Sequence, residues 1–156
     1  MTLVWLIVLP LAAGLAAWSA GRRNPDLARW ICITGLVMDL VLVAALWTGF
    51  VRISTLSDTG SWFAAIHKKW IPSLGISFHL AMDGLSLLMV TLTVLLGLAS
   101  VICSWTEIRE RVGFFHFNLM AVLSGIIGVF LAMDLILFYV FWEVMLLPMY
   151  FLIGVW

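Results

Sequence analysis

The chain has 156 residues, of which 65% are hydrophobic and 10% are charged, and its formal net charge is +0. A soluble domain of this length cannot bury so much apolar surface, because burial is limited by the ratio of surface to volume. The balanced charge and the lack of a basic run argue against a surface that follows nucleic-acid phosphates. Lipid is therefore the expected solvent for most of the chain.

Five stretches are each apolar and long enough to cross a bilayer, which takes about 20 residues in a helix. They lie at residues 2–21, 30–51, 84–106, 112–133 and 135–156. The first stretch lacks the basic start of a signal peptide, and Trp18 breaks the small-residue pattern before Ala20, so we expect an uncleaved helix. The sequence predicts an all-α membrane protein with five transmembrane helices.

The links between these stretches differ in length and charge. The short links hold five of the eight basic residues, Arg22, Arg23, Arg29, Arg109 and Arg111. The positive-inside rule then places the short links in the cytoplasm and the N-terminus outside. The longer link at 52–83 would also lie outside, and the Pro and Gly within 70–80 beside an apolar alternation predict a brief hairpin on the membrane surface.

Small residues recur at helical spacing in three of the predicted helices. Close approach of membrane helices depends on such residues, so we interpret these stripes as packing surfaces rather than a water path. Cys32 and Cys103 lie in apolar stretches, and we expect both to be buried packing residues rather than a disulfide or metal site. The stripes are Ala12, Ala16 and Ala20; Ser86, Thr93, Gly97, Ser100 and Ser104; and Ser124, Gly128 and Ala132.

Glu143 is the candidate functional residue, because it is the only formal charge within 135–156. A carboxylate at membrane depth costs roughly 2.5–3.5 kcal/mol on insertion scales, so it usually has a partner or a use. It lies roughly 13 Å beyond Asp134 at 1.5 Å per residue, and Tyr139 is on the same face one turn earlier. Pro148 frees a backbone carbonyl near it and favours a kink. We predict a buried proton-transfer group; a structural glutamate bonded to a neighbouring helix is the alternative.

Three other titratable residues stand out. Asp134 and Glu143 fall on opposite helix faces, so they are no acid/base pair, and Asp134 is expected to cap the start of the fifth helix. His116 lies one turn into the fourth helix among aromatic residues, either as an interfacial anchor or as a group that hands protons inward. Asp39 is a second deep charge in the second helix, with a structural and a functional role equally open. No metal or phosphate motif is present around His67 or His79.

Four segments resemble one family in detail: residues 79–89, 114–120, 128–135 and 142–153. They are similar to the antiporter-like membrane subunits of proton-translocating NADH–quinone oxidoreductase (respiratory complex I), in particular the subunit called chain M. The likeness is dense from about residue 70 to 156 and mostly compositional over the first two helices. Asp39 belongs to no matching motif. The resemblance implies that the fifth-helix glutamate, here Glu143, transfers protons and pairs with a lysine on the seventh helix.

The resemblance also implies an organisation. Such subunits have about fourteen helices with two inverted five-helix repeats that begin at the fourth helix. Residues 1–111 would then form three N-terminal helices with an outside loop at 52–83. Residues 112–156 would be the first two helices of the first repeat, and we expect the chain to be an N-terminal fragment. Other complex I subunits would be its partners in a bacterial inner membrane, and they would bind NADH, FMN, iron–sulfur clusters and quinone.

Two other functions remain as alternatives. A subunit of a multisubunit cation/proton antiporter shares the glutamate and the Asp-Gly-Leu-Ser segment at 83–86, although the amino-acid sequence of residues 142–150 favours complex I. A membrane scaffold that carries no protons would use the glutamate only to bond helices. Flavin and NADH dehydrogenase activity that co-purify with the protein distinguish complex I from an antiporter.

Overall fold

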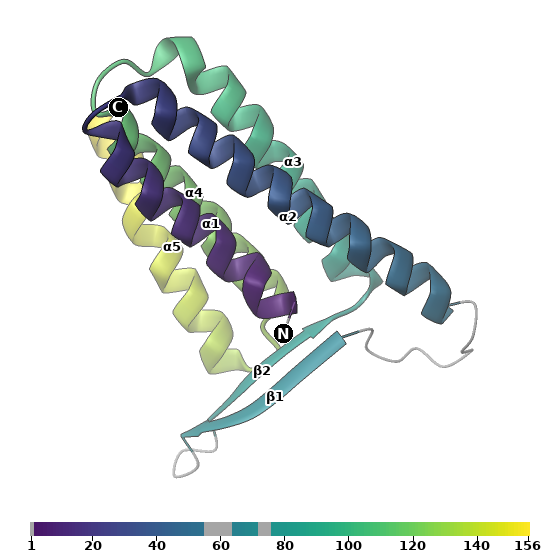
Figure 1. Ribbon diagram of the computed structural model, residues 1–156. Coiled ribbons are helices and arrows are strands. Elements are labelled where there is room, and N and C mark those ends of the chain that lie inside the picture. The colour runs from purple at the N-terminus through teal and green to yellow at the C-terminus, as the bar shows by residue number, and fades with distance from the viewer. Residues whose placement is uncertain (1, 55–63, 72–75) are drawn as a thin grey trace.

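The computed structural model describes residues 2–54, 64–71 and 76–156, and it contains five long helices and one hairpin. The helices are α1 (Thr2–Gly21), α2 (Pro25–Ser54), α3 (Gly84–Glu107), α4 (Val112–Leu131) and α5 (Leu135–Val155). Each is long and apolar enough to cross a membrane. They lie side by side along one direction, so the predicted all-α membrane bundle is confirmed (Figure 1).

The helix ends follow local capping chemistry. Helix α2 begins at Pro25, five residues before the apolar stretch, because the Asn24 side chain accepts a hydrogen bond from the Asp26 amide at 3.1 Å. Part of the charged link between the first two helices is therefore an additional turn of α2. Helix α3 begins after Asp83, which forms a capping box with Ser86. The Ser86 hydroxyl and amide lower the pKa of the Asp83 carboxyl, since both donate hydrogen bonds to it.

Helix α4 lies at the centre of the bundle, in contact with each of the other four helices. Helix α1 packs between α2 and α4, α3 packs on α2 and α4, and α5 packs mainly on α4. Apolar side chains fill one cluster near the hairpin and a second nearer the arginine-rich links. The α4–α5 contact is close, because a Cβ built on Gly125 would lie 2.6 Å from the Met145 Cβ, and one on Gly128 would meet the Phe141 ring.

The long link contains an antiparallel hairpin of β1 (Ala64–Ile71) and β2 (Ile76–Met82). The predicted hairpin is confirmed and is longer than expected, and its turn lies outside the described residues. It lies at the same end of the bundle as the N-terminus, whereas the 22–24 and 108–111 links and the C-terminus lie at the opposite end (Figure 1). The Met133 amide donates to the His79 carbonyl at 2.9 Å, which ties β2 to the start of α5.

The predicted packing stripes are right for α4, where Ser124 and Gly128 are buried, right for α3 except at the exposed Ser100, and wrong for α1. Thr93 and Ser104 are buried with their hydroxyls bonded back to the carbonyls of Met89 and Val101, as expected for packing residues. In α1 the exposed face carries Ala12 and Ala16, and the bundle instead contacts Gly14, Ala17 and Gly21. The cysteine prediction is half right, since Cys32 is buried and Cys103 is exposed on the outer face of α3.

Candidate functional site

Glu143 lies near the middle of α5 and is exposed on the outer face of the bundle. The expectation of a group buried within these helices is therefore wrong. The packing residues Phe141 and Met145 face α4, and Glu143 is about 200° from Phe141 at 100° per residue, so it points away from α4. The alternative of a glutamate bonded to another helix also finds no support, since the described residues offer it no such contact.

Among the described residues, Tyr139 is the side chain placed beside Glu143, as the one-turn spacing predicted. Its hydroxyl lies on the same helix face as the Glu143 carboxylate, where it can donate a hydrogen bond to it. Tyr139 is 59% exposed, so the pair forms a polar spot on an otherwise apolar surface. A phenol beside a carboxylate can hold a proton in a defined position, which suits transfer to a group that approaches from outside.

Pro148 is one of two buried residues of α5, together with Leu137. The helix continues through Pro148 to Val155, so the proline does not end it. Proline removes the hydrogen bond that the carbonyl four residues earlier would accept, and that carbonyl belongs to Val144, next to Glu143. The site on α5 therefore combines a carboxylate, a phenol and a backbone acceptor within two turns.

Asp134 is the N-cap of α5, as the sequence predicted. One carboxylate oxygen accepts the Ile136 amide at 2.9 Å, and the other accepts the amide and the hydroxyl of Ser77 at 3.1 Å each. These hydrogen bonds, with the Ser77 amide first, hold the pKa of Asp134 below its usual range. Asp134 thus joins β2 to α5 and faces away from Glu143.

His116 is fully buried inside the bundle rather than placed at a lipid interface, so the anchor interpretation is wrong. Its Nδ1 lies 2.9 Å from the Val112 carbonyl, which assigns the proton to Nδ1 and leaves Nε2 as an acceptor without a partner in the described chain. Arg29, a residue that sequence reasoning left in a link, is also buried and donates to the Ile108 carbonyl at 3.0 Å and to Asp26 at 2.6 Å. The i, i+3 spacing of Asp26 and Arg29 was the available signal.

Asp39 is fully buried at a position where α2 faces the bundle. Neither carboxylate oxygen has a hydrogen-bond partner in the described chain. Leu36 and Val43, one turn to each side, belong to the two apolar clusters, so Asp39 interrupts the core between them. Among the described residues no group of three or more His, Cys, Asp or Glu side chains is placed to hold a metal.

No family model matches the chain. Two curated relatives match over its whole length, and each is called NADH-quinone oxidoreductase subunit M. The relative from Pseudomonas aeruginosa is 52% identical and the one from Escherichia coli K12 is 48% identical; the chain spans 31% of the length of either. Among solved structures, the archaeal membrane-bound sulfane sulfur reductase complex has a chain that matches 95% of this one and is itself covered over 22%. The TM-score is 0.73 at 20% identity, so that likeness concerns the fold alone.

The sequence matches extend through α1 and α2 as well, where the expected resemblance was only compositional. They agree with the five apolar helices and with the likeness in fold to a respiratory membrane complex. By sequence, this chain belongs to the subunit M family of NADH-quinone oxidoreductases.

Proposed function

We propose that this chain serves in a membrane subunit of a proton-translocating NADH:quinone oxidoreductase, in which electron transfer from NADH to quinone drives proton export. The family of the relatives supports this activity. The observation that carries the mechanism is a single carboxylate, Glu143, on the outer face of a membrane-spanning helix. Other subunits would hold NADH, FMN, iron–sulfur clusters and quinone.

Glu143 would be the proton-transfer group. A carboxylate that faces lipid at mid-depth is costly, so the face that carries it is expected to contact protein instead. The family resemblance implies a lysine-bearing helix as that contact. A lysine ammonium near the carboxylate would favour its charged form, and removal of the lysine would favour protonation. A movable ion pair of this kind lets the carboxylate take up and release a proton in turn.

The other site residues would support Glu143 rather than exchange protons with it directly. Tyr139 would orient the carboxylate through its hydrogen bond, and Pro148 would leave the Val144 carbonyl free as a place for water. Asp134 would fix the depth of α5 against the hairpin. His116, buried among aromatic rings with a free Nε2, would serve proton entry from the arginine-rich end.

The domain organisation and the membrane orientation are parts of the same proposal. Residues 1–111 would form an N-terminal unit of three helices with the 52–83 loop, and residues 112–156 would begin the first antiporter-like repeat. In a bacterial inner membrane the arginine-rich links would face the cytoplasm and the N-terminus the periplasm, following the positive-inside rule. The placement of the N-terminus and the hairpin at one end of the bundle is consistent with this orientation.

The deciding experiment replaces Glu143 in the complete gene product and measures the assembled complex. Reconstituted into vesicles, the Glu143→Gln complex should lose NADH-driven proton uptake by about 100-fold or more, the scale of a positioned proton-transfer group. Glu143→Asp should retain part of it, since the carboxyl remains. Glu107→Gln is the matched control, because Glu107 is an exposed glutamate at the end of α3.

Assembly is measured separately, by the amount of intact complex that carries flavin. A scaffold role predicts that Glu143→Gln lowers this amount but leaves proton uptake per complex unchanged. Tyr139→Phe should lower proton uptake less than Glu143→Gln, whereas Tyr150→Phe, a second exposed tyrosine of α5, should have no effect. Full coupled uptake in the glutamine variant would refute the role of Glu143.

A further inference from the structure

Two adjoining grooves lie at the arginine-rich end of the bundle, far from Glu143 in the middle of α5. The larger has a volume of about 710 Å³ and is lined mainly by the end of α1 and the link to α2, including Trp18, Arg23 and Leu27. The second, of about 400 Å³, lies between the ends of α1 and α4 and includes Arg111. Trp18 and Arg22 line both grooves, so the two grooves meet at these side chains and together make up one basic depression.

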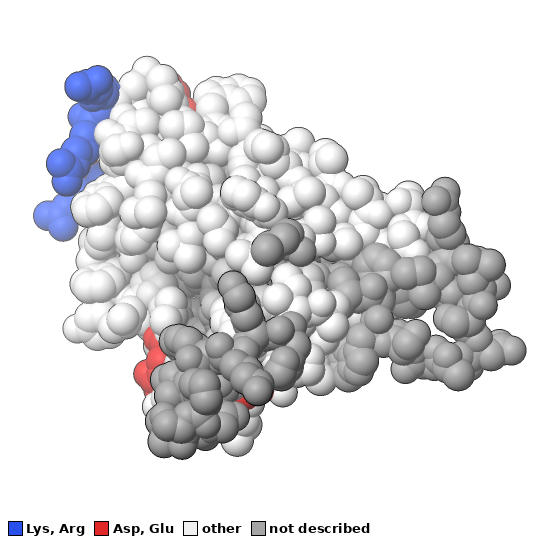
Figure 2. Space-filling model, turned by 60° about the horizontal axis from the view of Figure 1, so that its bottom comes forward, with Lys and Arg blue, Asp and Glu red and all other residues white. Residues whose placement is uncertain are grey.

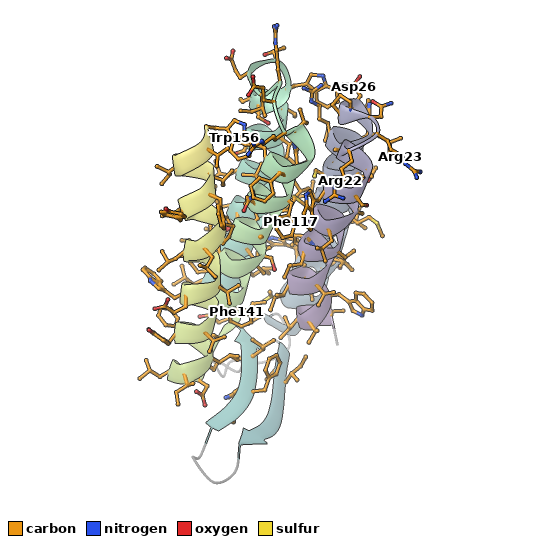
Figure 3. All side chains as sticks on the ribbon, turned by 90° about the vertical axis from the view of Figure 1, so that its left-hand side faces the viewer. Arg22, Arg23, Asp26, Phe117, Phe141 and Trp156 are labelled. Atoms are coloured by element: carbon orange, nitrogen blue, oxygen red, sulfur yellow. The ribbon has the colours of Figure 1, made fainter. Side chains whose placement is uncertain are left out.

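The rim of this depression is strongly basic. Arg22, Arg23 and Arg111 are all exposed, and none has a carboxylate partner in the described part of the chain. The acidic residue nearest in sequence to Arg22 and Arg23, Asp26, already pairs with Arg29 at 2.6 Å. Figure 2 shows Lys and Arg side chains gathered along one edge of the molecule, and Figure 3 places Arg22 and Arg23 at the end of α1 beside α2. A ligand for this rim is expected to be an anion.

The wall beneath the rim is aromatic and apolar. The Trp18 ring stacks on Phe117 with centroids 5.6 Å apart, and Phe114 lies 6.5 Å from it. The Arg22 guanidinium lies 5.2 Å from the centroid of the Trp18 ring, a cation–π contact, and the Arg22 side chain is exposed. Tryptophan one turn inside a helix end is typical of the level where lipid headgroups meet acyl chains.

The backbone adds positive potential to the same place. Helix α4 begins after Arg111, whose backbone is left-handed at φ 49°, and no side chain caps this end of the helix. Gly113, in the first turn of α4, lines the smaller groove and packs against Gly21 so closely that neither position has room for a Cβ. The positive end of the helix dipole therefore adds to the charge of the three arginines.

We propose that this depression binds the headgroup of an anionic glycerophospholipid, with its phosphate among Arg22, Arg23 and Arg111 and its upper acyl chain along Trp18 and Phe114. The arginine rim favours an anionic ligand because the charges are complementary. The apolar wall favours a lipid over a soluble anion, because a soluble anion would make no contact with that wall. Arginine side chains above an apolar wall, at the level of the lipid headgroups, also favour a lipid over an acidic protein segment. The site is independent of the proton-transfer role proposed for Glu143.

The test uses tryptophan quenching by brominated lipids in vesicles that contain the complete gene product. Trp18 is the reporter, and its signal is the difference between the wild-type protein and Trp18→Phe. Brominated phosphatidylglycerol in a phosphatidylcholine background should quench Trp18 at lower mole fraction than brominated phosphatidylcholine does. Arg22→Gln or Arg23→Gln should weaken this preference about five-fold each, the usual effect of one basic residue near an anionic surface.

Arg109→Gln is the matched control, because Arg109 is exposed at the same end but lines neither groove and donates to the Thr106 carbonyl at 3.4 Å. It should leave the preference unchanged. Equal quenching by the two lipids in the wild-type protein would overturn the proposal. Displacement of the brominated phosphatidylglycerol by inorganic phosphate at constant ionic strength would also overturn it, since the site would then recognise free phosphate.

Discussion

Replacement of Asp39 by valine should stabilise the protein, although Asp39 is the deepest charge-bearing residue of α2. Its side chain is 0% exposed, and neither oxygen meets a hydrogen-bond donor in the described chain. A buried polar group without a partner costs about 1–3 kcal/mol, and valine removes that cost. Repacking of the branched side chain between Leu36 and Val43 offsets part of the gain, so the expected net increase in unfolding free energy is about 1–2 kcal/mol.

The assay is SDS-induced unfolding of the complete gene product in detergent micelles, followed by far-ultraviolet circular dichroism. Asp39→Asn serves as the shape-matched control, since the amide is as poorly partnered as the acid and should change stability little. Loss of stability in both variants would refute the reasoning, because it would mean that donors, such as a buried water, hold the carboxyl in place.

Two other predictions concern the α4–α5 hairpin. Gly128→Ala should lower the unfolding free energy in the same assay by about 1–3 kcal/mol, since its Cβ meets the Phe141 ring, whereas Gly154→Ala, with open space around it, should not. Hydrogen exchange of the Ser77 amide, corrected for intrinsic rates, should accelerate on acidification. The folded pKa of Asp134 is lowered, so its stabilisation is complete above the unfolded value of about 3.9 and is lost as the pH falls through the folded pKa. Asp134→Asn should abolish this pH dependence.

Much of the fold follows from the sequence, because apolar length alone identifies membrane helices. The Asp134 cap was also predictable, since the aspartate stands between two apolar runs at a helix start. The true start of α2 at Pro25 was missed because the charges of that turn were interpreted as a link. The capping residue Asn24 with Pro25 after it was a usable signal.

Which side of each helix packs against the bundle could not be predicted from apolar length. Helix α1 is apolar on all sides, so nothing in its pattern distinguishes the Ala12 face from the Gly14 face. The contacts of Gly14 with Met120 and Phe117 decide it, and those depend on how α4 packs. His116 illustrates the same limit, since its aromatic neighbours suggested an interfacial position and packing placed it inside.

The exposed position of Glu143 follows from the way in which α5 packs on the bundle. Only 11% of the apolar window of α5 is buried, against 50% for α4, so α5 contacts the bundle along one narrow edge. The close contacts of Gly125 and Gly128 with α5 determine which side of α5 faces α4. Glu143 lies on the opposite side of α5. A carboxylate on a helix face that contacts lipid would cost roughly 2.5–3.5 kcal/mol without a compensating interaction. A helix face that contacts a basic helix gives the carboxylate a partner. The α1–α4 helices then leave Glu143 and Tyr139 on the free side of α5, and the proton transfer proposed for Glu143 would take place with a basic group that contacts this side.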